Sequence, residues 1–200
     1  MKEKSLGLLV LFALAVAACG GGDDSVDVGS DEAVIQITSE GGFAPVEFVL
    51  GAGPRFTMLG DGTLIFSGVT TLEFPGRLVP PYVTAQLSAG QMNAVLAMVD
   101  DIGLADILNE TDDSAANFVA DATTEVIRYW DSDGEHRYAV YALGIQEDPS
   151  ERNAAFLELI ETLDQFAAQT PGETYEPERV RVIAGPANPN PDFPDMRPGP

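Results

Sequence analysis

The sequence predicts an α+β domain in which an antiparallel sheet, built from two hairpins plus added strands, packs two amphipathic helices on one face. Two segments rich in β-branched and aromatic residues are each interrupted by a Gly/Asp turn, and two segments have apolar residues at helical spacing. These elements follow one another in the order β-β-α-β-β-α. Because each helix has a single apolar face, one face of a sheet is the simplest partner that buries both.

The first hairpin is expected between Arg55 and Ser67, where RFTML and TLIFS flank Gly60-Asp61-Gly62. The glycines supply the positive φ that such a turn needs. Tyr82 to Leu87 alternates and predicts a third strand, which we place at an edge because Pro80 and Pro81 have no N–H to donate.

The first helix is predicted to begin after Ser88, which has the capping-box spacing to Gln91. Gly103 is expected to end it. Its apolar stripe consists of Met92, Val95, Leu96 and Val99.

A second hairpin is predicted from Thr123 to Trp130 and from His136 to Leu143, with its turn at Asp131–Gly134. The aromatic residues of this hairpin are expected to form stacked cross-strand pairs: Tyr129, Trp130, Tyr138 and Tyr141. Ser150 predicts the start of the second helix, which ends before Pro171 and has the stripe Phe156, Leu159, Ile160, Leu163 and Phe166. Val34–Ile37 and Val180–Ile183 are short candidate strands.

The flanks differ from this domain in composition. We predict a signal peptide over 1–18, a flexible acidic and glycine-rich tether over 19–32, a single α+β domain over 33–185 and a disordered tail over 186–200. Eight of the fourteen prolines lie between Pro171 and Pro200, and the last fifteen residues have no apolar periodicity.

The N-terminus has a basic beginning, a short apolar stretch and small residues before the chain's one cysteine. Val16-Ala17-Ala18-Cys19 resembles the lipobox of bacterial lipoproteins, with Val16 where leucine is commonest. The resemblance implies cleavage before Cys19, lipidation of its thiol and anchoring to the outer side of the cytoplasmic membrane. Several acyl chains hold a protein firmly where one would not. The alternative is a plain secretory signal with an incidental cysteine. The remaining chain also resembles uncharacterised lipoprotein domains, in which a DG-turn hairpin leads towards an amphipathic helix.

The charge excludes one class of partner. The formal net charge is −22 at pH 7, and beyond the predicted signal there are 31 acidic residues, eight arginines and no lysine. With no basic stripe to release counterions from phosphates, we expect no nucleic-acid partner. The ordinary interpretation of the excess acidic residues is that they keep the protein soluble or adapt it to salty surroundings. The more specific alternative is a cationic partner.

No catalytic constellation stands out. His136 is the one histidine, so HExxH and multi-histidine metal sites are impossible, and we interpret it as an ordinary strand residue near a loop. G-x-S-x-G, P-loop and dinucleotide motifs are absent from the sequence, so no cofactor is predicted. Paired carboxylates for a hydrolase have almost no specificity among so many acids.

Two acidic groups are weak candidates for a metal. Asp131, Asp133 and Glu135 superficially resemble the opening of a calcium loop, but the glycine comes too early and Val140 holds the place of the closing glutamate. Glu110, Asp112 and Asp113 lie in a predicted loop, whose ordinary interpretation is a solvated linker.

Three functional hypotheses follow. The leading one is a non-enzymatic, membrane-tethered module that binds an envelope protein or ligand, with its lipid on Cys19. The second is a calcium- or cation-responsive binding protein, and the third is a carboxylate-based hydrolase.

Overall fold

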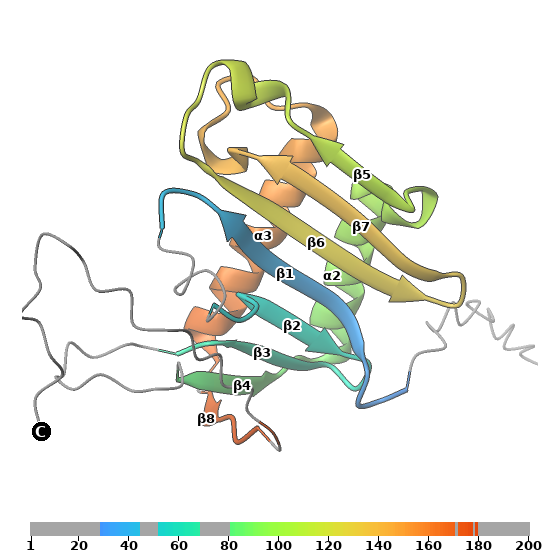
Figure 1. The fold of residues 1–200 in the computed structure, drawn as a ribbon. Coiled ribbons are helices and arrows are strands. Elements are labelled where there is room, and N and C mark those ends of the chain that lie inside the picture. Colours follow the sequence, from blue (N-terminus) through green and yellow to red (C-terminus); the bar gives the residue numbers. More distant parts are fainter. Residues whose placement is uncertain (1–28, 45–51, 69–80, 171, 178, 180–200) are drawn as a thin grey trace, which may run out of the picture.

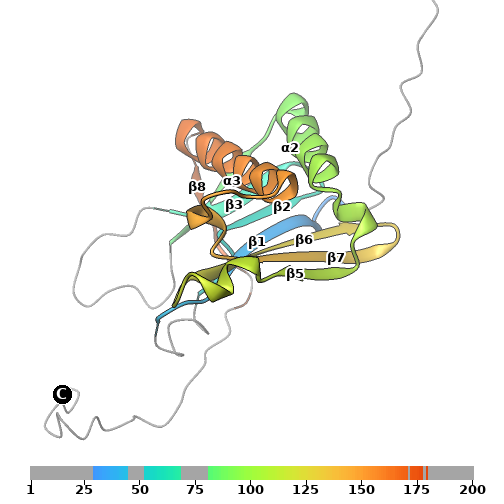
Figure 2. The same cartoon turned by 90° about the horizontal axis from the view of Figure 1, so that it is seen from above.

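The computed structural model describes residues 29–44, 52–68, 81–170, 172–177 and 179. They form one eight-stranded sheet with both long helices on the same face, as Figures 1 and 2 show. The strand order is β5-β7-β6-β1-β2-β3-β4-β8. The predicted α+β class is therefore confirmed.

The strands are β1 (Ala33–Gly41), β2 (Phe56–Leu59), β3 (Thr63–Ser67), β4 (Tyr82–Gln86), β5 (Asn109–Asp112), β6 (Thr123–Asp131), β7 (Gly134–Tyr141) and β8 (Glu173–Thr174). The helices are α2 (Ala89–Ile102) and α3 (Glu151–Gln169), with short 3₁₀ turns η1 (Leu104–Asp106), η2 (Ser114–Asn117) and η3 (Leu143–Ile145). All neighbouring strands are antiparallel except β5 and β7, which are parallel. The sheet is thus mixed, and the simple β-β-α-β-β-α order is incomplete because β1, β4, β5 and β8 add to the two hairpins.

The first hairpin forms where it was predicted, as β2 and β3. Gly62 in its turn has φ of 85°, and a Cβ there would lie 2.6 Å from the Met92 sulfur. This glycine therefore serves two needs, a left-handed backbone and close contact between the turn and α2. The third strand, β4, pairs with β3 as expected, but its other side pairs with β8, so it is not the last strand of the sheet.

Both helix starts agree with the capping prediction. The Ser88 hydroxyl accepts from the Gln91 N–H, while the Gln91 side chain accepts from the Ser88 N–H. Gly103 ends α2 in the left-handed conformation, with φ of 72°. Ser150 caps α3 through the N–H of Asn153.

The β6–β7 hairpin forms as predicted, but two expectations around it were wrong. Residues Asn109–Asp112 form β5 rather than a loop, because their backbone pairs with β7. The four hairpin aromatics do not stack on one another, because the register sets Tyr129 opposite His136 and Tyr138 opposite Ile127. Val180–Ile183 lies outside the described residues, whereas Val34–Ile37 falls within β1.

The core lies between the helices and one face of the sheet. Side chains alternate along a strand, so Ile37, Ile127 and Tyr138, which are adjacent across β1, β6 and β7, all point to that face. The side chains that the two helices bury there are Val95, Val99, Ile102, Phe156, Leu159, Ile160 and Leu163. The opposite face contains Arg128, which pairs with Glu40 and Glu135, and also the buried Val126 and Ala139.

Phe156 offers a test of this one-sided core, because its side chain is fully buried. Phe156→Ala is expected to lower the free energy of unfolding by about 3–5 kcal/mol, through lost apolar burial and the cavity that remains. Phe118, with 89% of its surface exposed, provides the control. Urea denaturation should find Phe118→Ala close to wild type, and equal losses in the two variants would contradict the packing.

Candidate functional site

The predicted lipidation site is outside the described structure. Cys19, Val16–Ala18 and the tail over 186–200 all fall among residues that the structure does not describe. None of the helices in the described ranges is both long and apolar enough to cross a membrane.

His136 is buried, with 2% of its surface exposed, and lies on β7 next to the hairpin turn. Its Nδ1 is 2.8 Å from the carbonyl oxygen of Ile107, and its Nε2 is 3.0 Å from Oδ1 of Asp131. Both neighbours are acceptors, whereas a neutral imidazole has only one N–H. The ring satisfies both contacts when it is protonated, and in that state His136 forms an ion pair with Asp131.

Electrostatics agree with this protonation state. Burial by itself would lower the pKa of His136, but the hydrogen bonds to Ile107 and Asp131 and the charges of Asp131 and Asp133 together raise it above 6.5. For Asp131, burial opposes ionisation, yet hydrogen bonds from the Asp133 and Gly134 backbone and from His136 lower its pKa below 3.8. The pair therefore connects the hairpin turn to the segment that follows α2.

Two of the three carboxylates proposed for a cation site have other partners. Asp131 holds His136 and also accepts from the backbone N–H of Asp133. Glu135 pairs with Arg128 at 3.4 Å, on the sheet face away from the helices. Among the described residues there is no group of three or more His, Cys, Asp or Glu side chains that could hold a metal ion.

A second buried polar cluster joins α3 to β5 and β7. Asn153, 1% exposed, accepts from the Tyr138 hydroxyl at 2.6 Å and donates to Asp112 and to Gln146. Burial and the nearby Asp112 carboxylate raise the pKa of Tyr138 to about 12, so its hydroxyl stays neutral and donates. Hydrogen bonds from Ser114 and Asn153 lower the pKa of Asp112. This cluster occupies its own donors and acceptors, which indicates a structural role.

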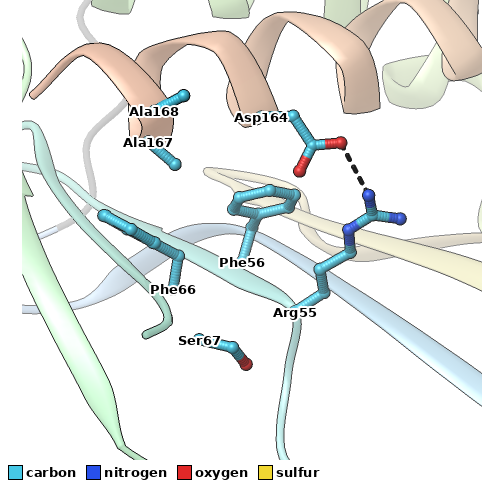
Figure 3. Close-up of a pocket in the computed structure, with 7 residues that line it drawn as sticks. All are labelled: Arg55, Phe56, Phe66, Ser67, Asp164, Ala167 and Ala168. Carbon is cyan, nitrogen blue, oxygen red and sulfur yellow. Dashed lines mark hydrogen bonds and ion pairs between the residues drawn. The ribbon is translucent and has the colours of Figure 1, made fainter. Parts of the chain in front are cut away.

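An open groove lies where the last turns of α3 pass over β2 and β3, with a cavity volume of about 360 Å³. Figure 3 shows the residues that line it: Arg55, Phe56, Phe66, Ser67, Asp164, Ala167 and Ala168. The Phe56 and Phe66 rings form an aromatic floor because these residues are paired in the β2–β3 register. The two alanines leave the space that larger side chains on α3 would fill.

The mouth of the groove has one positive and one negative side chain. Arg55 Nη2 is 2.6 Å from Asp164 Oδ2, and both side chains are nearly half exposed. The guanidinium also lies 5.5 Å from the centre of the Phe56 ring. An aromatic floor beneath accessible charges suits a small ligand that has both an apolar body and a polar group.

Sequence reasoning did not single out this groove. Its residues come from 55–67 and 164–168, and no local pattern relates these two segments. Two weak signals existed: the pair Ala167-Ala168 beside the apolar stripe, and a scarce arginine as the first residue of a predicted strand.

Neither family models, nor curated proteins, nor solved structures provide a match to this chain.

The His136–Asp131 pair predicts how stability depends on pH. The pKa of His136 is raised on folding. Its contribution to the free energy of unfolding is therefore complete below pH 6.5 and is lost as pH rises through the raised pKa. The pKa of Asp131 is lowered, so its contribution is lost as pH falls through a value below 3.8. We expect the free energy of unfolding to be highest between these limits, as measured by urea denaturation across the pH range.

Asp131→Asn removes the negative charge of this side chain but keeps an oxygen that can accept from Nε2 of His136. It therefore tests the charge separately from the hydrogen bond. We expect it to lower the pKa of His136 in an NMR titration and to cost about 1–3 kcal/mol at pH 6. Glu135→Gln, on the same hairpin but on the other sheet face, is the control and should leave the titration almost unchanged. A wild-type midpoint below 6.5 would refute the ion pair.

Proposed function

We propose that this chain is a non-enzymatic binding module, held on the extracytoplasmic side of the cell membrane by lipid on Cys19, and that the groove beside α3 is its binding site. The lipobox-like segment supports the anchor. The observation that supports binding is the groove itself, which combines an aromatic floor with half-exposed charges.

The other polar groups of the domain support a binding role rather than catalysis. His136 is committed to Ile107 and Asp131, and Asn153 is committed to the Tyr138–Asp112 cluster. No buried side-chain nitrogen or oxygen in the described ranges lacks a hydrogen-bond partner. Buried groups that are already paired stabilise the fold, whereas the groove keeps its polar groups accessible to a ligand.

The anchor is tested by replacing its thiol. The wild-type chain is expected in the membrane fraction, with a cleaved and acylated N-terminus by mass spectrometry. Cys19→Ala should leave the membrane fraction, because the sole acylation site is lost. The control is Ser25→Ala in the predicted tether, which should stay with the membrane. An uncut, unmodified wild-type N-terminus would refute the proposal.

The groove is tested with a neutral ring compound, benzyl alcohol, titrated into the full-length chain in a neutral detergent. We expect weak binding, of roughly millimolar Kd, with NMR shifts concentrated at the lining residues. Ala168→Phe fills the groove from its exposed rim and should abolish these shifts. Ala154→Phe adds the same ring at an exposed position elsewhere on α3 and should retain them. Turnover of an esterase, peptidase or glycosidase panel, lost on substitution of one carboxylate, would instead establish an enzyme.

A further inference from the structure

We propose that the groove beside α3 selects a cationic ligand, in which an ammonium, amidinium or guanidinium group is attached to a ring or a short apolar chain. This inference rests on the proposed function, namely that the groove is a binding site. Four features favour a cation: the end of α3, the Asp164 carboxylate, the phenylalanine rings and the net charge of the whole sequence.

The groove lies at the negative end of the α3 dipole. α3 has nineteen residues, and Ala167 and Ala168 in its last turn line the groove. The C-terminal carbonyls of a helix concentrate partial negative charge, which favours a nearby cation. The last turn of α3 contains no basic residue, so the helix itself supplies no side-chain cation at this position.

Asp164 can accept more hydrogen bonds than Arg55 donates. The guanidinium contacts only Oδ2, through one nitrogen, and within the described parts of the chain Oδ1 has no hydrogen bond. Figure 3 shows this second oxygen turned towards the Phe56 ring, on the groove side of the carboxylate. An ionised carboxylate offers both oxygens, so a ligand N–H can bind Oδ1 while Arg55 keeps Oδ2.

The aromatic floor already receives a cation from the chain itself. Arg55 lies over the Phe56 ring at 5.5 Å, which is within the range of cation–π attraction. Phe66 pairs with Phe56 across β2 and β3 and lines the same groove. Both rings are largely buried, so a ligand cation would reach them only from the groove, beside Phe66 or in place of the half-exposed Arg55 over Phe56.

The charge of the whole chain acts in the same direction. A formal net charge of −22 attracts cations and repels anions before any contact forms. An anion would have to bind Arg55 against this field. The ion pair neutralises Arg55 and Asp164 equally, so it is the surrounding field and the C-terminal end of α3, and not the pairing, that disfavour an anion.

The test compares three ring compounds of almost the same shape: benzamidine, which is cationic, benzyl alcohol, which is neutral, and benzoate, which is anionic. Each is titrated into the full-length chain in a neutral detergent, with Kd taken from NMR shifts at the groove. We expect benzamidine to bind about tenfold more tightly than benzyl alcohol, and benzoate to bind more weakly than either.

Two substitutions at the ion pair should have opposite effects. Asp164→Asn is expected to weaken benzamidine about tenfold while leaving benzyl alcohol nearly unchanged. Arg55→Gln should strengthen benzamidine, because it frees both the carboxylate and the Phe56 ring. The matched control is Glu110→Gln, which disrupts a similar arrangement near the other end of α3, where Arg152 pairs with Glu110 and lies 5.4 Å from the Tyr138 ring. It should change none of the three affinities.

The outcomes separate this inference from the proposed function. Equal binding of the three compounds, all lost in Ala168→Phe, would keep the groove as a binding site and overturn the preference for a cation. Tighter binding of benzoate, lost in Arg55→Gln, would establish an anion site and also overturn it. If none of the compounds binds at the groove, the proposed binding function falls together with the inference.

Discussion

The structure depends on the burial of two apolar helix faces against a single face of one sheet. Phe156, Leu159 and Leu163 of α3 pack with Val95 and Val99 of α2 over the central strands. Both helices lie on one side of the sheet, and the opposite face contains the Arg128 ion pairs. Apolar burial is the dominant favourable term in folding, so this layer determines how every other element is placed.

Two buried polar clusters complete the fold where the apolar layer meets its edges. His136 connects the hairpin turn to the chain after α2, and Asn153 connects α3 to β5 and β7. Their partners are close and directional, and a buried donor or acceptor without a partner would cost about 1–3 kcal/mol. The clusters therefore favour one arrangement of the helices and strands. Apolar contact alone would specify that arrangement less closely.

The groove follows from the same layer at the end of α3. The apolar stripe continues to Phe166, and the next two residues are alanines, whose short side chains line the groove beside the largely buried Phe56 and Phe66. Arg55, directly before β2, meets Asp164 of α3 at the mouth, where both side chains stay nearly half exposed. A concave surface thus arises where packing ends, next to charges that remain half in water.

The sequence by itself determined the local elements: the hairpins at Gly62 and Gly134, the cap at Ser88 and the stripe of α3, because each is encoded by residues close together in the chain. Only the tertiary structure decided that Asn109–Asp112 joins β7 in parallel and that Asp131 pairs with His136. It also decided that Arg55 meets Asp164, 109 residues further along the chain. Such contacts depend on the relative position of whole elements, which follows from packing and not from any local pattern of residues.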